Sequence, residues 1–250
     1  MTWDLRGKTA LVTGGAKRIG KEIALGLADE GVNVIIHYLT ADKAAGELRE
    51  ELTGKGVGSW TLRADFEKSE YEGLIERAAG EAGTIDILVN NASIFLKNTL
   101  DEISFPDLMD HMRINAWAPF ELCRDFHRIM KRGKIINLLD SRTDGYDWAH
   151  VDYILSKHVF TELTRMIAVK YAPDVAVNGI APGLILPPPG KDEGYLVKMD
   201  RTVPLKRHGT PREIAEACVY LLKSEFLSGE VIYVDGGRHL MEYDHGPHPD

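Results

Sequence analysis

Residues 9–20 read TALVTGGAKRIG, and this stretch decides the fold. A short apolar run ends at a glycine-rich turn, which opens directly into a helical pattern. Such a turn between a strand and a helix lets backbone amides and the N-terminus of the helix meet a pyrophosphate. We expect Gly14 to make the tight turn and Gly20 to let the helix pack close to the sheet. Two cations, Lys17 and Arg18, favour a bound anion at the same place.

An apolar run followed by a helix-length stretch recurs along the rest of the chain. The runs, which we expect to be strands, cover residues 9–13, 32–37, 59–62, 85–89, 134–139, 175–180 and 231–234. Helices are expected at residues 19–30, 43–52, 71–82, 107–131, 150–171 and 211–223. Most runs are continuously apolar, which is typical of parallel strands that are covered on both faces. The pattern predicts an α/β fold with a doubly wound sheet, which binds ligands beyond the carboxyl ends of its strands.

Composition points to one domain. The 250 residues are 44% hydrophobic and 27% charged, as in ordinary globular proteins, and no linker divides them, so residues 1–250 are expected to form a single domain. Residues 184–208 leave the end of a predicted strand and are expected to act as a lid, with a solvated loop as the alternative. Residues 238–250 are expected to be a mobile tail; three histidines there (His239, His245 and His248) have no element to fix a metal-binding spacing.

Charge and cysteine content limit the partners and the compartment. The chain has 30 basic and 38 acidic residues, and its net charge of −8 disfavours nucleic acid. No window approaches the roughly 20 apolar residues that a membrane span needs. Cys123 and Cys218 lie far apart in the sequence and are expected to be reduced thiols. We therefore expect a cytoplasmic protein without a nucleic-acid, membrane or metal partner.

The end of the second predicted strand bears on cofactor choice. Dinucleotide folds that prefer NAD place a carboxylate there, about 20 residues after the glycine turn. Here the strand ends in His37 and Tyr38, and Asp42, with Thr40, looks like helix-capping chemistry. With two cations in the turn and no acid to repel a 2′-phosphate, NADPH is favoured over NADH.

Two more polar groups follow strands at the same edge. Asp65 and Phe66 follow the third strand, where a carboxylate can accept a hydrogen bond from the adenine amino group or cap the next helix. The fourth strand is followed by Asn90, Asn91, Ala92 and Ser93. We expect the side-chain amides of this group to tie the strand ends together beside the ribose.

A candidate reacting group follows the fifth strand. Tyr153 and Lys157 are four residues apart on a predicted helix and therefore share one face. The ammonium would stabilise a phenolate, lower the pKa of the tyrosine and reach the nicotinamide ribose. Asp140 ends the fifth strand thirteen residues before Tyr153, and Asn115 lies midway along the preceding predicted helix.

Taken in order, these motifs resemble the short-chain dehydrogenase/reductase family over nearly the whole chain. They comprise residues 13–20, residues 90–93, Asn115, Tyr153 with Lys157, Pro182 with Gly183, and residues 235–237. The resemblance implies a seven-stranded Rossmann domain, hydride transfer from a nicotinamide, and a homotetramer. It implies that Tyr153 is the acid/base, that Lys157 is its partner, and that Asn115 supports a proton relay. The remaining implied cofactor contacts are Ile19, Pro182, Gly183, Leu184 and Ile185.

Two departures from the family pattern resemble its pteridine reductase branch, including the bacterial dihydromonapterin reductases. Arg18 stands where the family usually has glycine, and Asp140 stands where it usually has serine. His37 with Tyr38, Ser93 in place of glycine, and an aromatic residue at Phe95 also resemble that branch. The resemblance implies that Phe95 stacks on a pterin and that Arg18 bridges pyrophosphate and substrate. The implied substrate-binding set is Arg18, Ser93, Phe95, Asp140 and Tyr153.

The chemistry of Asp140 agrees with that branch. An ionised carboxylate can only accept hydrogen bonds, so it suits a ring with N–H groups better than a carbonyl oxygen that gains negative charge. The alternative is that Ser141 takes the serine role, but only one of two neighbouring side chains can face the site, and the spacing favours Asp140. Tyr146, Trp148 and His150 either line the pocket or cover the start of the helix.

The sequence therefore predicts an NADPH-dependent reductase that delivers hydride to a reduced pterin. Dihydromonapterin or dihydrobiopterin is the expected substrate, and dihydrofolate a weaker one. The first alternative is a ketone reductase of the same family, acting for instance on 3-oxoacyl thioesters. The second is an NADPH-binding sensor or scaffold without turnover, against which the intact Tyr153, Lys157 and Asn115 argue.

Overall fold

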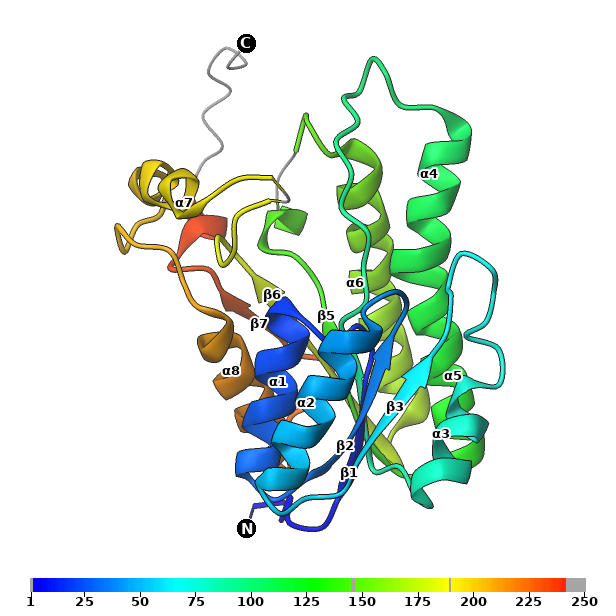
Figure 1. Ribbon diagram of the computed structural model, residues 1–250. Coiled ribbons are helices and arrows are strands. Elements are labelled where there is room, and N and C mark those ends of the chain that lie inside the picture. Colours follow the sequence, from blue (N-terminus) through cyan, green and yellow to red (C-terminus); the bar gives the residue numbers. More distant parts are fainter. Residues whose placement is uncertain (1, 145–146, 189, 242–250) are drawn as a thin grey trace.

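Seven parallel strands form the central sheet, in the order β3-β2-β1-β4-β5-β6-β7 (Figure 1). Their bounds are β1 Thr9–Val12, β2 Asn33–Tyr38, β3 Ser59–Arg63, β4 Ile87–Asn90, β5 Gly133–Leu138, β6 Val175–Pro182 and β7 Val231–Val234. The computed structural model describes residues 2–144, 147–188 and 190–241. The predicted fold, a doubly wound sheet in one domain, is confirmed, and each strand lies where an apolar run was recognised.

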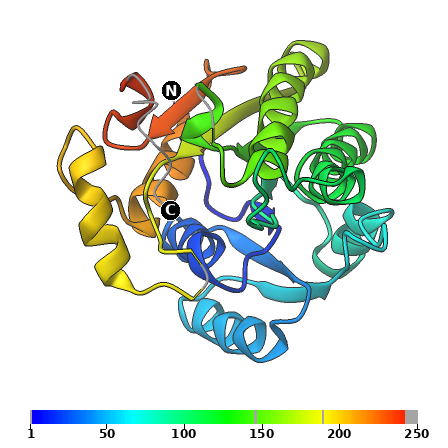
Figure 2. The same cartoon turned by 90° about the horizontal axis from the view of Figure 1, so that it is seen from above.

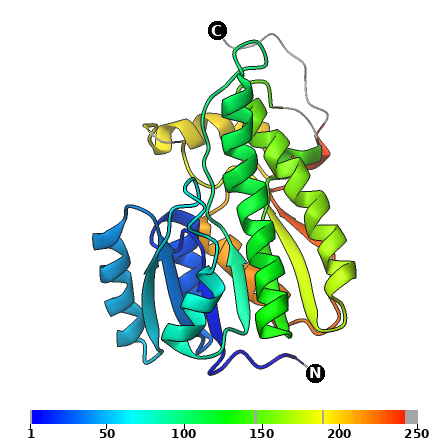
Figure 3. The same ribbon diagram turned by 90° about the vertical axis from the view of Figure 1, so that its right-hand side faces the viewer.

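Helices cover both faces of the sheet. Their bounds are α1 Arg18–Asp29, α2 Asp42–Gly54, α3 Leu74–Ala82, α4 Phe105–Met112, α5 Ala118–Met130, α6 Val151–Tyr171, α7 Glu193–Met199 and α8 Pro211–Lys223. One face carries α1, α2 and α8, and the other carries α3, α5 and α6. Figure 3 shows α5 and α6, both green, running side by side along the second face.

Burial on both faces explains the continuous apolar runs. Along β1, Ala10 and Val12 enter the core beneath α1 and α8, whereas Leu11 enters the core beneath α3 and α5. Along β2, Val34 and Ile35 divide between the two cores in the same way. Because successive side chains of a strand point to opposite faces, every position of such a strand meets a helix layer and favours an apolar residue.

The topology fixes where a ligand can bind. The strand order reverses between β1 and β4, and crevices at such a switch point bind ligands beyond the carboxyl ends of the strands. The parallel register brings the ends of β1, β4, β5 and β6 to one edge. Figure 2 looks down onto this edge, with α7 (yellow) along one rim.

The helix predicted over residues 107–131 is interrupted. Between α4 and α5, residues Arg113–Trp117 form a single π-helical turn, η1, which contains Asn115. A π turn inserts one extra residue into the helical ladder and is frequent at functional sites. Here it allows the buried Asn115 side chain to point toward the sheet edge, where its hydrogen bonds lie.

Two helix starts differ from the sequence expectation. The predicted capping of α2 by Thr40 and Asp42 is wrong: Ala41 is the N-cap, and the structure records no side-chain cap there within the described residues. Asp42 lies instead in the first turn, where a carboxylate is favourable next to the helix dipole. The helix expected from residue 71 begins at Leu74, because Gly73 before it has a φ of 71° that breaks the ladder.

The expected lid, residues 184–208, contains α7 and a 3-10 turn at Asp200–Thr202, and it lies beyond the carboxyl edge on the side of β6 and β7 (Figure 1). Of the expected tail, Arg238–Leu240 form a 3-10 turn, while residues 242–250, with His245 and His248, lie outside the described residues. The described ranges hold no group of three metal-ligating side chains. None of the helices described is long and apolar enough to cross a membrane.

Candidate active site

A groove of about 510 Å³ opens at the carboxyl edge. Its lining includes most of the residues that the sequence singled out: Gly14, Lys17, Arg18, Ile19, Gly20, Asn91, Ala92, Ser93, Phe95, Asp140, Tyr153, Lys157, Pro182, Gly183, Leu184 and Ile185. Among the described residues, five others lie outside this lining, namely His37, Tyr38, Asp65, Phe66 and Asn115. The fold thus gathers residues from the loops after β1, β4, β5 and β6 and from helices α1 and α6 around one space.

The backbone of the glycine-rich turn explains why glycine stands at two of its positions. Gly14 has a φ of 61°, the left-handed region that favours glycine. A Cβ on Gly20 would lie 2.3 Å from the carbonyl oxygen of Gly14, so that position must also lack a side chain. Arg18 has a φ of 55°, which is uncommon for a residue with a side chain, and its guanidinium donates to the Pro187 carbonyl of the lid at 2.9 Å.

His37 supports the turn from below and does not face the groove. Its ring is 2% exposed, and its Nδ1 accepts a hydrogen bond from the Gly14 amide at 3.1 Å. Its Nε2 is therefore the donor to the Ala64 carbonyl, 3.1 Å away. Burial lowers the pKa of His37 to about 4, so the ring is neutral at physiological pH. The buried side chain of His37 is therefore not placed for a direct contact with a cofactor in the groove.

The alternative expected for Asp65, capping of the next helix, is wrong: the N-cap of α3 is Gly73, with no side-chain cap hydrogen bond among the described residues. The Asp65 carboxylate, itself buried, accepts from the Glu67 amide at 3.1 Å. Phe66 stacks on the His37 ring with centroids 4.6 Å apart. Phe66 therefore supports the floor of the turn through His37.

The asparagines after β4 tie the strand ends together, as expected. Asn90 Nδ2 donates to Asn137 Oδ1 on β5 at 2.9 Å, and Asn91 Nδ2 donates to the Thr13 carbonyl after β1 at 2.9 Å. The Asn91 amide thus joins the ends of β1 and β4 at the switch point, and the Asn90 amide joins β4 to β5.

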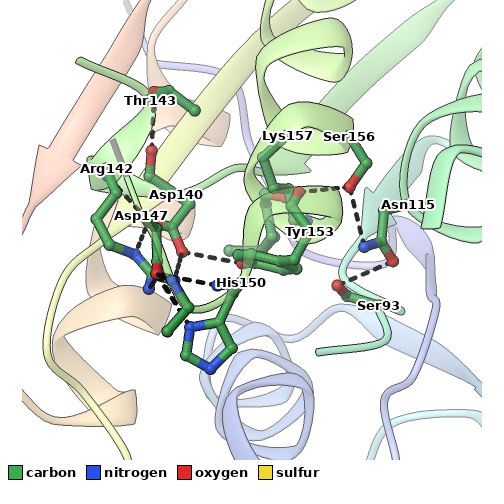
Figure 4. A network of polar contacts seen from close by, with 12 residues as sticks. Ser93, Asn115, Asp140, Arg142, Thr143, Asp147, His150, Tyr153, Ser156 and Lys157 are labelled. Carbon is green, nitrogen blue, oxygen red and sulfur yellow. Dashed lines mark hydrogen bonds and ion pairs between the residues drawn. The ribbon is translucent and has the colours of Figure 1, made fainter. Parts of the chain in front are cut away.

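Tyr153 and Asp140 meet at the centre of the groove. The Tyr153 hydroxyl, presented by the first turn of α6, donates to Asp140 Oδ2 at 2.9 Å (Figure 4). One turn later, Lys157 Nζ donates to the Leu138 carbonyl at 2.8 Å. Ser141 also lines the groove, but Asp140 is the side chain that reaches the hydroxyl.

Burial and charge set the protonation states of this group. Burial would raise the pKa of Asp140, but the charge and hydrogen bonds of Arg142 outweigh it, and the pKa lies below its ordinary value. Burial and then the charge of Asp140 raise the pKa of Tyr153 well above its ordinary value. Burial lowers the pKa of Lys157 to about 8, and Asp140 opposes that shift. Near neutral pH the group is therefore a carboxylate, a phenol and an ammonium.

Arg142 belongs to the site, although the sequence did not reveal it. Its Nε donates to Asp140 Oδ1 at 2.9 Å and its second terminal nitrogen to Oδ2 at 2.8 Å, while the first bonds Asp147 (Figure 4). The guanidinium carbon lies 5.4 Å from the centre of the Phe95 ring and 5.6 Å from that of Tyr153. This position lies in a short polar 3-10 turn, where no periodicity indicates which side chain points inward.

Phe95 forms an aromatic wall beside the hydroxyl. Its ring meets Tyr153 edge to face with centroids 4.7 Å apart and stacks on His150 at 4.1 Å. Of the other two aromatic residues suggested for the pocket, Trp148 is 43% exposed, and Tyr146 lies outside the described residues.

Asn115 and Ser93 form the support on the opposite side of Tyr153. Asn115 Oδ1 accepts from the Ile94 amide at 2.9 Å and from Ser93 Oγ at 3.1 Å. Its Nδ2 donates to Ser156 Oγ of α6 at 3.1 Å. Asn115 therefore links the loop after β4 to the helix that carries Tyr153 and Lys157.

Comparisons with known proteins agree with this geometry. Residues 14–239 match a family model described as enoyl-(acyl carrier protein) reductase. The 3-oxoacyl-[acyl-carrier-protein] reductase FabG of Staphylococcus epidermidis is 31% identical over 242 residues, which cover 93% of this chain and 99% of that protein. The 5-keto-D-gluconate 5-reductase of Escherichia coli is 32% identical over 248 residues, covering 94% and 96%.

Solved structures are also similar. The FolM alternative dihydrofolate reductase 1 from Brucella canis, complexed with NADP, has a TM-score of 0.92 at 28% identity and covers 98% of both chains. The corresponding protein from Brucella suis, also in complex with NADP, has a TM-score of 0.90 at 29% identity, covering 94% of this chain and 96% of that one. With the matched family model and full-length relatives of this identity, the chain belongs to the short-chain dehydrogenase/reductase family of oxidoreductases.

Proposed function

We propose that this enzyme is an NADPH-dependent reductase of reduced pterins, with dihydromonapterin or dihydrobiopterin as substrate and dihydrofolate as a weaker one. The observation that carries the proposal is the acceptor-only carboxylate of Asp140, which lies 2.9 Å from the hydroxyl of Tyr153, the residue whose ring meets Phe95 edge to face. A flat nitrogen heterocycle offers N–H donors to that carboxylate and a π face to that ring. The similarity to dihydrofolate reductases of the FolM type supports the same substrate class.

The cofactor end of the groove fits a dinucleotide. Gly14 and Gly20 leave room for close backbone approach, and the first amides of α1 face the groove beside two cations, Lys17 and Arg18. Asn91, Ala92 and the backbone of Leu184 and Ile185 line the continuation toward the reacting end. We assign pyrophosphate binding to the turn and nicotinamide binding to the segment after β6.

Reduction of a C=N bond in the substrate adds a hydride to carbon and a proton to nitrogen. NADPH, when bound, supplies the hydride. Tyr153 supplies the proton, which its high pKa keeps on the phenol until the substrate nitrogen gains negative charge. Lys157 stabilises the resulting phenolate and holds the ribose, while Asp140 orients the ring by accepting its N–H groups. Asn115 supports proton return by fixing η1 against α6.

A ketone reductase of the same family is the second candidate, because the similar sequences are named for 3-oxoacyl and keto substrates. The two functions are separated by following NADPH oxidation with dihydropterins and, in parallel, with an acetoacetyl thioester. We expect turnover of the dihydropterins. Turnover of the thioester alone would reverse the assignment, and NADPH binding without any turnover would favour a sensor or scaffold.

We also propose that the enzyme is a cytoplasmic homotetramer. Several large apolar side chains are exposed on the outer faces of α4, η1 and α6, namely Phe105, Trp117, Met166 and Val169. These side chains would be buried if a neighbouring subunit packed against the helices that carry them. Cys123 and Cys218 are buried free thiols, as in proteins of reducing compartments.

Replacing Gly20 with alanine is expected to weaken NADPH binding about tenfold, because overpacking the turn costs roughly 1–3 kcal/mol. The new methyl group would lie 2.3 Å from the Gly14 carbonyl oxygen and 2.6 Å from Asn91 Nδ2, so the turn must open. Fluorescence titration with NADPH measures the effect. Gly46→Ala is the control, since a Cβ there meets nothing within 4 Å. Equal affinities of the two variants would show that the turn does not bind the cofactor.

The pH dependence of turnover is expected to follow Lys157. Its pKa of about 8 means that the ammonium is present below that pH and is lost above it. Because the ammonium stabilises the phenolate, kcat/KM should decline as the pH rises through about 8. Initial rates over a pH series, with NADPH held saturating, test this. A profile that stays level far above pH 8 would mean that Lys157 acts without its charge.

A further inference from the structure

Behind the groove lies a buried pair of polar side chains, His111 and Asp152, that the proposed mechanism does not use. His111 Nδ1, on α4, is 3.0 Å from Asp152 Oδ2, on α6, and both side chains are 0% exposed. A buried carboxylate needs several hydrogen bonds to offset its loss of hydration. The hydrogen-bond partners of the Asp152 carboxylate therefore indicate which segments of the chain it holds in place.

Asp152 collects donors from three segments of the chain. Its Oδ1 accepts from the Tyr153 amide at 2.8 Å, and its Oδ2 accepts from Asn98 Nδ2 at 2.5 Å in addition to His111. His111 Nδ1 also lies 3.0 Å from the Asp107 carbonyl, so this nitrogen carries the proton. His111 Nε2 has no hydrogen-bond partner among the described residues, so the hydrogen bonding of this ring is directed at Asp152 and its own helix.

Asn98 connects this pair to the loop that carries Phe95. The loop of residues 91–104 lies wholly within the described chain and forms neither helix nor strand. One group of hydrogen bonds, from Asn115, holds it at Ile94. A second holds it at Asn98, whose side chain bonds Asp152 and whose carbonyl accepts from the Val151 amide at 3.0 Å.

Phe95 lies between these two attachment points. The ring faces Tyr153, the residue that directly follows Asp152, with centroids 4.7 Å apart. The Asn98 attachment therefore sets how far the aromatic wall can move relative to the hydroxyl. A planar substrate must enter beside both groups, so the spacing between them governs its binding.

We propose that Asp152, held by His111, is a positioning residue that fixes the Phe95 loop against the start of α6 through Asn98 and so sets the width of the substrate site. This inference rests on the proposed function for the identity of the substrate, whereas the attachment itself can be measured without any substrate. Asp152 touches neither substrate nor cofactor and acts through Phe95 and Tyr153.

The test variant is Asn98→Ala, which removes one donor to the carboxylate and leaves the pair with His111 intact. We expect the KM for dihydropterin to rise about tenfold, as for loss of a hydrogen bond to a charged group, with kcat changed much less. The affinity for NADPH should stay the same. Thr99→Ala is the matched control in the same loop, because Thr99 Oγ1 bonds only Glu102 within the loop among the described contacts; it should leave KM unchanged.

Amide hydrogen exchange gives the second readout. Asn98→Ala should speed exchange in residues 93–100 and at Val151, while the amides of β1 and α1 keep their rates. Asp152→Asn should do the same, since its amide group opposes the donors of Asn98 and His111. Circular dichroism checks that each variant is folded.

Unchanged exchange in a folded Asn98→Ala variant would overturn the proposal, as would a loss confined to kcat with KM unaltered. Faster loop exchange in an enzyme that turns over no dihydropterin would leave the attachment established and remove the pterin assignment instead. The two failures are therefore distinguishable.

Discussion

Replacing Tyr153 with phenylalanine is expected to lower kcat for dihydropterin about 1000-fold, the contribution of a well-placed general acid. The change removes only the hydroxyl, which donates to Asp140 Oδ2 at 2.9 Å, and keeps the ring that packs edge to face with Phe95. The Tyr153 hydroxyl is protonated and lies at the centre of the groove, whereas Asp140 is ionised and has no proton to give. Single-turnover NADPH oxidation measures the chemical step directly.

Tyr171→Phe is the matched control for this prediction. Tyr171 lies at the other end of α6, where its ring stacks on His127 with centroids 4.3 Å apart, far along the helix from the groove. This variant should keep the wild-type rate, and both variants should bind NADPH normally. If Tyr153→Phe retained more than a small fraction of the wild-type kcat, proton donation would have to come from another group, and Tyr153 would only shape the pocket.

The sheet could be predicted from the sequence because each strand is marked by a pattern of neighbouring residues. Each strand is a run of apolar residues that meets a helix layer on both sides, as Leu11 and Val12 show within β1. The same reasoning found the glycine turn, since glycine is favoured at the positive φ of Gly14 and is needed for the close approach at Gly20. Spacing on one helix face found Tyr153 and Lys157.

Other features depend on contacts between distant segments, which no local pattern records. The π turn at Arg113–Trp117 is stabilised by the hydrogen bonds that Asn115 makes with the loop after β4 and with α6. Arg142 is a polar residue in a polar turn, and only the fold shows that its guanidinium enters the site. The sequence places His37 at the cofactor end of the sheet, yet successive side chains of a strand point to opposite faces, and this one, next to the last residue of β2, points into the floor.

Changing Asp140 to serine is expected to lower kcat/KM for dihydropterin about 100-fold, because each hydrogen bond to the carboxylate contributes about 1.5–3 kcal/mol. Serine presents a donor where the substrate ring is proposed to present its own N–H groups. A ketone oxygen, in contrast, accepts from a hydroxyl. The variant should therefore gain activity toward an acetoacetyl thioester relative to dihydropterin, and paired assays on the two substrates measure the switch.

Folding has to be separated from chemistry in this variant, because Asp140 also neutralises Arg142. Removing one member of a buried ion pair costs about 3 kcal/mol or more, since the other charge is left without its partner. Here Arg142 keeps Asp147, which limits the loss. The double variant Asp140→Ser/Arg142→Met removes both charges of this pair, while Asp147 keeps its hydrogen bonds with His150 and the Ala149 amide. It should recover part of the melting temperature without recovering dihydropterin turnover.

The two measurements together decide what the carboxylate does. If thermal stability and dihydropterin turnover recover together in the double variant, Asp140 serves only to neutralise Arg142, and the substrate must be oriented by other groups. If thermal stability recovers and dihydropterin turnover does not, the carboxylate itself binds and orients the substrate. We expect the second result, because the oxygen that bonds the Tyr153 hydroxyl lies on the wall of the groove, where a substrate nitrogen protonated by that hydroxyl would also lie.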